Sequence, residues 1–398
     1  MRGTLAVSLL VAGCTPKPTQ SPVAPERQDP CRLVADSAPP LDTLAVALLD
    51  PVDQDHALAP ANDSELLLYR MTLDTPLRLD CQGQARPGLA QSWEKDSTGR
   101  VWTLTLKDEA RRYDGSPMTA HDVAAAWNER MPVEGSMALQ AAVALDDRRI
   151  SVTLSRPQDS VPIMLADPVF SLAIDPTQRP PGVKFELQTG ADARDALDRG
   201  ADLVVTRDPA LVDYVAGRPE FSAFPLPWSR TYVLVQPAAA RPIDMARGDA
   251  ERRSLARDAV SADARAAEAP FWWNEVAACP SGLASGPIPT SSRIAYIRGD
   301  EVARGLAERI VALAGSGTGL RAAALEPTEF ARLLRTGSDP AYVVALPRHT
   351  LGPCRESSAW PREARIQPLI DTRAHAIVRR GAPPLTVEWD GTIRVVPR

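Results

Sequence analysis

The sequence predicts an α/β protein with mixed sheets. Short apolar runs such as Leu41–Leu49 and Ala341–Leu346 have the length and composition of buried strands. Helical patterns lie between such runs, and Glu301–Ala314 is the most clearly amphipathic of them. Strands that alternate with helices are typical of α/β folds. The chain has 398 residues, of which 44% are hydrophobic, so it is long enough for two or more lobes with separate cores.

The first half of the chain carries clear strand and helix signals. Val101–Leu106 alternates, which places Trp102, Leu104 and Leu106 on one face of a strand. Thr119 stands three positions before an acidic residue, as an N-cap does. The expected elements are strands at Leu41–Leu49, Leu77–Leu79, Val101–Leu106 and Ile150–Leu154, and helices at Ser64–Arg70, from Thr119 to Trp127 and at Ala191–Arg199.

The second half continues the alternation. In the helix over Glu301–Ala314, helical spacing places Val302, Leu306, Ile310 and Leu313 on one apolar stripe. A hairpin is expected around Asp390 near the end of the chain. The other expected elements are strands at Leu203–Val205, Thr231–Val235, Ile294–Ile297, Leu320–Leu325, Ala341–Leu346 and Ala374–Val378, and helices at Glu251–Arg265 and Thr328–Leu334.

The N-terminus predicts export. One arginine precedes a short apolar run within Met1–Gly13, which is too short to span a bilayer but has the size of a signal-peptide core. The run ends at Val11-Ala12-Gly13-Cys14, which resembles the lipobox of bacterial lipoproteins. That resemblance implies lipidation of Cys14 and attachment to a membrane surface. The polar, proline-rich residues 14–40 then form a flexible tether.

Four cysteines remain after Cys14. They are Cys31, Cys81, Cys279 and Cys354, and their wide spacing excludes a CxxC redox or zinc motif. An even number of cysteines in an exported protein favours disulfides, and three connectivities are possible. We favour Cys31–Cys81 and Cys279–Cys354, since each pair lies within one half of the chain; four isolated thiols are the alternative.

A series of motifs between residues 87 and 130 resembles the family 5 extracellular solute-binding proteins, the peptide- and nickel-binding components of ABC importers. The motifs are Pro87–Trp93, the hairpin strand Val101–Leu106, the turn Tyr113–Pro117 and the helix start Thr119–Val123, and they follow one another in the family's order. Looser matches extend the resemblance over most of residues 40–398, including Gly200–Val205.

The resemblance implies a two-lobed, periplasmic-binding-protein-like fold of type II, with a hinge near residues 225–232 and a ligand enclosed between the lobes. The implied organisation is a signal peptide at 1–13, a tether at 14–40, a first lobe at 41–227 completed by 366–398, and a second lobe at 228–365. The implied function is capture of a small or peptide-like solute for an ABC permease, by a monomer on the extracytoplasmic side of a membrane.

Two departures from the family motivate an alternative function. The chain is shorter than typical members, mostly in the second lobe. In peptide-binding members a late aspartate pairs with the amine of the ligand, whereas no aspartate lies between Asp339 and Asp371 here. The alternative is a degenerate binding-fold lipoprotein that acts as a sensor, scaffold or partner-binding module without transport.

Candidate ligand contacts are aromatic and arginine side chains near the expected cleft. A closing cleft is usually lined by aromatic residues and a few polar groups, and arginine binds a carboxylate in a two-pronged contact. The candidates come from the segment that crosses between lobes, from a tryptophan-rich loop and from the end of the strand at Ala341–Leu346. They are Trp228, Arg230, Tyr232, Trp272, Trp273 and Arg348.

The sequence offers little for catalysis, metal binding or nucleic-acid binding. The chain has no GxSxG elbow, GxxxxGK[ST] loop or HExxH helix, so we expect no enzyme, no catalytic residues and no cofactor. His56, His121, His349 and His375 are scattered, so we expect no metal site. A net charge of −5 gives no basic footprint for nucleic acid.

Overall fold

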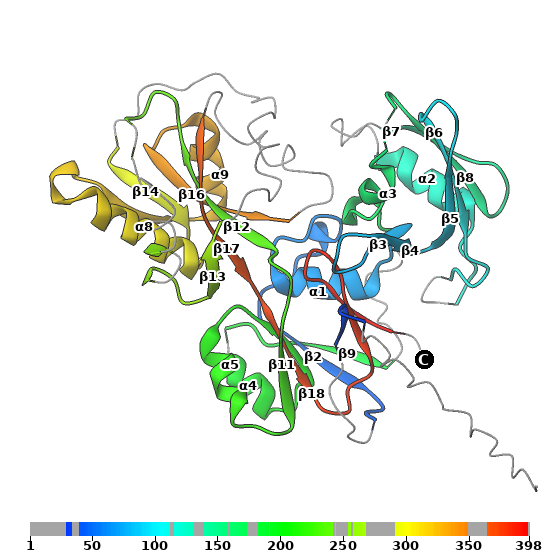
Figure 1. The fold of residues 1–398 in the computed structure, drawn as a ribbon, viewed down its shortest axis with the longest axis horizontal. Helices are drawn as coiled ribbons and strands as arrows, with labels where there is room; N and C mark the ends of the chain where they lie inside the picture. Colours follow the sequence, from blue (N-terminus) through cyan, green and yellow to red (C-terminus); the bar gives the residue numbers. More distant parts are fainter. Residues whose placement is uncertain are drawn as a thin grey trace, which may run out of the picture.

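The structure is a computed structural model of the chain. It describes residues 29–33, 40–111, 115–130, 139–157, 159–172, 182–190, 192–241, 243, 254–255, 258–267, 291–348 and 364–396. Within these ranges no helix is both long and apolar enough to cross a membrane. The signal peptide, Cys14 and most of the expected tether lie outside them. In Figure 1 the helices of the second lobe are drawn in yellow and orange.

The first lobe is built on a five-stranded mixed sheet. Its inner strand β2 is apolar throughout (LAVAL), as expected for a strand with helices on both faces of the sheet. Helix α1 packs on one face, and α4 and α5 pack on the other. The elements are, in sheet order, β11 (Phe221–Pro225), β18 (His375–Arg379), β10 (Leu203–Thr206), β2 (Leu44–Leu48) and β9 (Val183–Leu187), with α1 (Asp63–Thr72), α4 (Ala193–Asp198) and α5 (Pro209–Ala216).

A second sheet belongs to the same half of the chain and has its own core. It is antiparallel, and the side chains of Trp102, Leu104 and Leu106 are buried on one face, as the alternation predicted. Trp127 closes this core with an edge-on contact to Phe170, whose carbonyl accepts its indole N–H at 3.2 Å. The elements are β5 (Ala90–Lys95), β6 (Val101–Leu106), β8 (Arg149–Leu154) and β7 (Leu139–Ala144), with α2 (Ala120–Arg130), α3 (Val161–Met164) and η2 (Pro168–Phe170).

The second lobe is a six-stranded mixed sheet between two helices. Helix α8 buries Val302, Leu306 and Ile310 on one face, and α9 buries Phe330 and its neighbours on the other. The elements are, in sheet order, β13 (Asp263–Ala266), β17 (Arg365–Arg373), β12 (Arg230–Gln236), β16 (Ala341–Pro347), β14 (Arg293–Ile297) and β15 (Arg321–Leu325), with α8 (Glu301–Ala314), η3 (Ser316–Thr318) and α9 (Pro327–Thr336).

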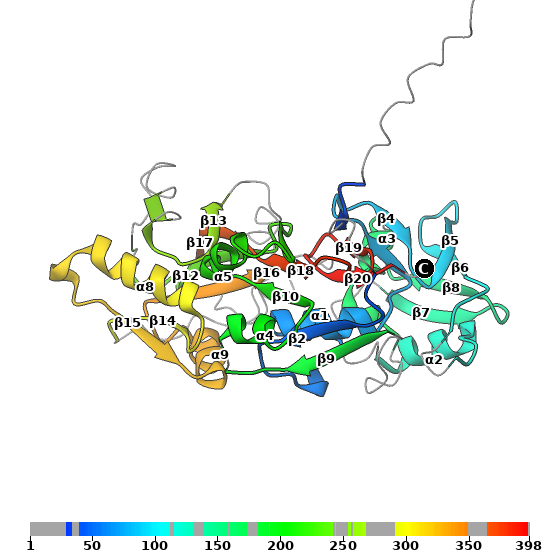
Figure 2. The same cartoon turned by 90° about the horizontal axis from the view of Figure 1, so that it is seen from below.

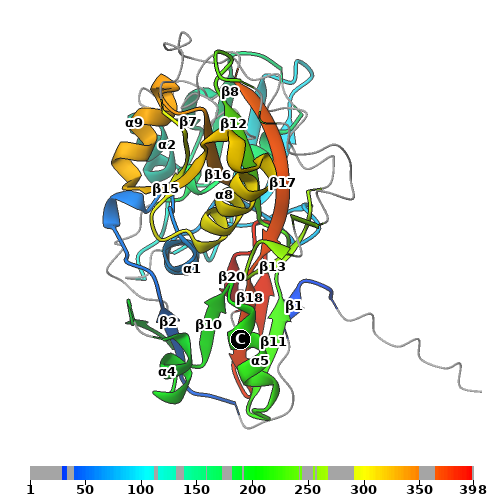
Figure 3. The same cartoon turned by 90° about the vertical axis from the view of Figure 1, so that its left-hand side faces the viewer.

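The described chain passes between the lobes twice, side by side. Residues 226–229 connect β11 to β12, and Ala374 alone connects β17 to β18. Figure 3 shows β17 running on into β18 across this boundary. The two passages are tied together, since Leu226 N–H donates to the Ala374 carbonyl at 2.9 Å. Two short connections that lie side by side in this way form a hinge about which the lobes can close.

Two small sheets complete the first lobe, one packed against α1 and the other against α3. A disulfide joins Cys31, beside β1, to Cys81, beside β3, in agreement with the pairing favoured from the sequence. Their Cα atoms are 5.3 Å apart. The remaining elements are β1 (Arg32–Leu33), β19 (Leu385–Val387) and β20 (Ile393–Val395) in one sheet, β3 (Leu77–Leu79) and β4 (Ala85–Pro87) in the other, and η1 (Gln54–His56). Figure 2 shows β19 and β20 between the two larger sheets of this half.

The structure corrects three expectations. Residues 32–33 are not tether but a strand paired with β19, so the fold begins before residue 40. Residues 366–373 belong to the second lobe, because β17 pairs with β12 and β13 there. The helix expected over Glu251–Arg265 is wrong at its end, where Asp263–Ala266 is strand β13.

The apolar stripe of α8 is also shorter than expected. Leu313 is 50% exposed, whereas Val302, Leu306 and Ile310 are buried. The last turn of the helix therefore extends beyond the sheet that it covers.

Candidate functional site

A cavity of about 780 Å³ lies between the two lobes. First-lobe residues that line it follow β2 and β10, such as Asp50 and Arg207, and second-lobe residues follow β14 and β16, such as Asp300 and Arg348. β2 runs parallel to β10, and β14 runs parallel to β16, so the carboxyl ends of all four strands meet the cavity. Ligands in open α/β sheets bind outside such strand ends. A volume of this size suits a small molecule.

Asp63 anchors the polar wall of the cavity. It is the first residue of α1, whose N-cap Asn62 accepts from Glu65 N–H at 2.8 Å. Arg207 donates to both oxygens of Asp63, from Nε at 2.6 Å and Nη2 at 2.9 Å, and Arg230 donates from Nη2 at 3.3 Å. Burial alone raises the pKa of the Asp63 carboxyl, but the two guanidiniums outweigh burial and hold that pKa well below its usual range.

Tyr232 and Asp300 continue this wall into the second lobe. The Tyr232 hydroxyl donates to Asp300, with oxygen distances of 3.1 and 3.3 Å. Burial first, and the charge of Asp300 after it, raise the pKa of the phenol, so Tyr232 stays a neutral donor. Asp300 is the N-cap of α8 and accepts from Ala303 N–H at 2.9 Å. The wall therefore runs from Asp63 through Arg230 and Tyr232 to Asp300.

Two more carboxylates of the first lobe line the cavity. Asp50 accepts from the backbone N–H and the hydroxyl of Ser64, at 3.3 and 3.0 Å. Asp208 is the N-cap of α5 and accepts from Ala210 N–H at 2.9 Å. Both carboxylates are thus oriented by neutral donors.

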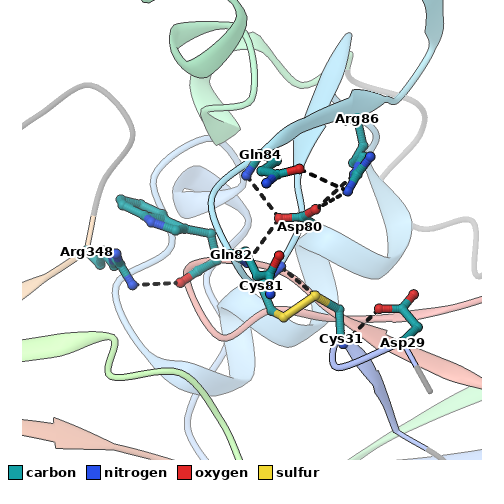
Figure 4. The surroundings of a disulfide bond; sticks show 9 residues. Asp29, Cys31, Asp80, Cys81, Gln82, Gln84, Arg86 and Arg348 are labelled. Atoms are coloured by element: carbon teal, nitrogen blue, oxygen red, sulfur yellow. Dashed lines mark hydrogen bonds and ion pairs between the residues drawn. A yellow bond between two sulfur atoms is a disulfide. The ribbon is translucent and has the colours of Figure 1, made fainter. Parts of the chain in front are cut away.

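Arg348 joins the second lobe to the disulfide region of the first. Its guanidinium lies 3.9 Å above the Trp389 ring and donates to the Trp389 carbonyl at 3.4 Å. Figure 4 shows this contact beside the Cys31–Cys81 bond. Burial lowers the pKa of Arg348 to about 10. Gly83, in the turn that follows Cys81, packs closely on the Trp389 ring. A Cβ added to Gly83 would lie 3.0 Å from that ring, so the turn supports it.

Trp228 lies at the hinge and is not among the residues that line the cavity. The guanidiniums of Arg265 and Arg373 lie 4.7 and 4.6 Å from its ring. Each guanidinium is held by a carboxylate, Arg265 by Asp371 at 3.2 Å and Arg373 by Asp263. The contacts of the Trp228 ring with the two guanidiniums fix the crossing segment, and Trp228, a predicted ligand contact, lies at the hinge outside the described lining of the cavity.

The expected site residues thus divide into three groups. Arg230, Tyr232 and Arg348 come together at the cavity, and Trp228 lies beside it at the hinge. Trp272 and Trp273 lie outside the described residues, as do Cys279 and Cys354. Among the described residues, no group of three or more His, Cys, Asp or Glu side chains could hold a metal ion.

Sequence reasoning missed Asp50, Asp63, Arg207, Asp208 and Asp300. Four of these follow a predicted buried strand or begin a predicted helix within a few residues. The rule that ligands bind beyond the carboxyl ends of parallel strands was applied to Arg348 and applies equally to them. Asp63 also stands at the start of a predicted helix, but only the fold brings the start of α1 to Arg207 and Arg230.

The comparisons with known proteins agree with this architecture. Residues 84–202 match the model of the bacterial extracellular solute-binding proteins, family 5 Middle. The Escherichia coli murein tripeptide binding protein MppA superposes with a TM-score of 0.60 at 11% identity, covering 89% of this chain and 99% of that one. NikZ from Campylobacter jejuni, solved in complex with Ni(L-His), gives a TM-score of 0.61 at 11% identity, covering 89% and 98%.

Sequence relatives match over short segments. The Haemophilus influenzae periplasmic oligopeptide-binding protein OppA is 42% identical over 48 residues, which is 12% of this chain and 9% of that protein. The E. coli periplasmic murein peptide-binding protein MppA is 33% identical over 78 residues, 19% of this chain and 14% of the relative. The chain is therefore a relative of the family 5 extracellular solute-binding proteins, and it has their two-lobed fold.

Proposed function

We propose that the chain is a lipid-anchored, extracytoplasmic solute-binding protein. It captures a small or peptide-like solute between its lobes and delivers it to an ABC permease. The observation that carries this proposal is the cavity of about 780 Å³, which both lobes line and beside which the chain crosses twice. Closure about those crossings encloses a solute, and opening at the permease releases it.

The proposed extracytoplasmic location of the protein rests on the N-terminal sequence and on the disulfide. Val11–Cys14 resembles a lipobox, and lipidation of Cys14 attaches the protein to a membrane surface. A disulfide between Cys31 and Cys81 supports an oxidising compartment outside the cytoplasm. The protein acts as a monomer, without a cofactor or a catalytic reaction.

The ligand contacts in this proposal are Arg230, Tyr232 and Arg348, together with Trp272 and Trp273 from the loop outside the described residues. Arg230 and Tyr232 are held in place by Asp63 and Asp300, so they are preorganised before the ligand arrives. Preorganised polar groups bind with less loss of conformational entropy.

Native mass spectrometry of the mature protein, followed by a thermal-shift panel, tests the proposal. We expect a co-purified small molecule that, when added back, raises the melting temperature, because a ligand at 100 times its Kd stabilises the folded state by about 2.7 kcal/mol. Replacement of Tyr232 by Phe should weaken that shift, and Tyr214→Phe, outside the cavity, serves as control. No co-purified species and no shift across peptides, sugars and metal chelates would instead favour the sensor or scaffold alternative.

A further inference from the structure

We propose that the ligand of this cavity is an organic cation, a solute that carries an amine or guanidinium group. The inference rests on the proposed function and names its substrate class. Among the described residues that line the cavity, seven are carboxylates and three are arginines. The lining therefore carries four more negative than positive charges. A cleft lined by charges of one sign raises the local concentration of solutes of the opposite sign.

The three arginines that line the cavity are already bound by groups of the protein. Arg207 and Arg230 share the carboxylate of Asp63, with contacts from 2.6 to 3.3 Å. Arg348 lies on the Trp389 ring and donates to its carbonyl. Each guanidinium therefore already has a partner within the fold, although Nη1 of Arg207 donates no hydrogen bond among the described residues.

Three carboxylates, by contrast, have only neutral partners among the described residues. Asp50 accepts from Ser64, Asp208 from Ala210 N–H, and Asp300 from Ala303 N–H and the Tyr232 hydroxyl. The N-termini of α5 and α8 offset about half a charge each at Asp208 and Asp300. At Asp50 and Asp208 the remaining negative charge faces the cavity with no described cationic side chain beside it, whereas the charge of Arg230 partly balances that of Asp300.

These carboxylates stand on opposite lobes. Asp50 and Asp208 belong to the first lobe, whereas Asp300 caps the first helix of the second lobe. Closure brings like charges together in a space from which water is excluded, and this repulsion opposes closure of the empty cavity. A cation between the lobes removes the repulsion. The negative charge of the cavity lining therefore both binds the ligand and couples ligand binding to closure of the lobes.

The cavity favours an organic cation over a bare metal ion. Its volume of about 780 Å³ is far larger than one ion needs. Among the described residues, no three His, Cys, Asp or Glu side chains approach closely enough to coordinate one ion. Several separated carboxylates suit a ligand with more than one polar group.

A panel of matched solutes tests the charge. N-acetyl-lysine amide, N-acetyl-norleucine amide and N-acetyl-glutamate amide have similar size and differ in charge, and the panel adds polyamines, peptides and the solute released from the purified protein. Binding is measured by calorimetry at low and high salt. We expect the bound solutes to be cationic, with affinity that falls as salt rises.

Two carboxylate variants test whether the negative charge that binds the ligand lies in the cavity. Asp208→Asn and Asp300→Asn should each weaken cation binding 10-fold or more, while Glu326→Gln, an exposed carboxylate of the second lobe outside the lining, should leave it unchanged. A neutral or anionic solute bound with equal affinity by wild type and both variants would overturn the charge assignment and leave the solute-binding function standing. Absence of any bound solute would overturn the function itself.

Discussion

Asp63→Asn removes the carboxylate that two arginines share at the cavity wall while keeping the shape of the side chain. In the wild-type protein Arg207 donates to both Asp63 oxygens and Arg230 to one. An Asn side chain has one amide oxygen, which accepts hydrogen bonds, and one NH₂ group, which donates them. The NH₂ group would therefore face a guanidinium N–H, which is also a donor. Two arginines would then stand near each other without a compensating charge.

The expected cost follows from burial. The side chains of Asp63, Arg207 and Arg230 are 20%, 16% and 20% exposed. Breaking a buried ion pair by removing one partner costs about 3–5 kcal/mol, whereas exposed pairs contribute about 0–1 kcal/mol. The Asp63 cluster is mostly buried, so we expect a loss of about 3 kcal/mol of unfolding free energy. For a chain of 398 residues, with an unfolding entropy of about 2.1 cal/mol/K per residue, that loss lowers the melting temperature by about 4 °C.

Calorimetry of the purified protein measures the change. Asp159→Asn is a matched control, because Asp159 also forms an ion pair at 2.6 Å, with Lys95, but is 88% exposed. That variant should melt within about 2 °C of wild type, since an exposed pair contributes little. Equal shifts in the two variants would refute the reasoning from burial.

The pH dependence supplies a second readout for Asp63→Asn. The folded protein holds the pKa of Asp63 below its ordinary value of 3.8, so the charge stabilises the fold at all pH values above 3.8. The stabilisation is lost only as the pH falls through the lower pKa of the folded state. The difference between wild type and variant should thus stay constant from pH 7 to about pH 4 and narrow in stronger acid. A difference that disappeared already by pH 5 would contradict the pKa assigned to Asp63.

Three further predictions concern stability, each measured by denaturant unfolding. Replacing Cys31 and Cys81 by serine should cost about 4 kcal/mol, because the bond closes a loop with a sequence separation of 50, and an unchanged midpoint would contradict a formed disulfide. Leu104→Ala should cost about 2–5 kcal/mol, since Leu104 is fully buried, and a cost below 1 kcal/mol would place it outside the core. Gly305→Ala should cost about 1–3 kcal/mol, because its Cβ would lie 2.1 Å from the Ala259 carbonyl oxygen, and a neutral result would refute that close packing.

Elements with strong local patterns could be predicted from the sequence. The strand Val101–Leu106 alternates in burial as its residues alternate in polarity, and the helix Glu301–Ala314 has the bounds that its periodicity predicts. The motifs from Pro87 onward also led to the family, and the two-lobed fold follows from it. In these cases local preference and tertiary packing favour the same structure.

Elements defined by distant partners could not be predicted. Asp263–Ala266 lies at the end of a charge-rich segment that was predicted as a helix, yet it forms an edge strand because β17 offers it unpaired hydrogen-bonding groups. Arg32–Leu33 forms a strand for a similar reason, held against β19 and by the nearby disulfide. Strand β17 was not predicted, and it forms because it pairs on both edges within the second lobe.

The candidate site was predictable in part. Arg230 and Tyr232 were predicted because their segment was expected to cross between the lobes, and Arg348 because it follows an apolar strand; all three line the cavity. The same rule places Trp228 near the crossing but does not say that two guanidiniums cover its ring. Asp63 becomes part of the site only through contacts with residues 144 and 167 positions away in the sequence.

Small-angle X-ray scattering with and without ligand tests the central claim, that the lobes close on a solute, most directly. The protein is unfolded to release its co-purified solute, refolded, and measured before and after that solute is added back at saturation. The account predicts a smaller radius of gyration in the loaded protein, and the same decrease in the Asp300→Asn variant only at solute concentrations about 10-fold higher or more. A bound solute, shown by calorimetry, that leaves the radius of gyration of wild type unchanged would contradict capture by lobe closure.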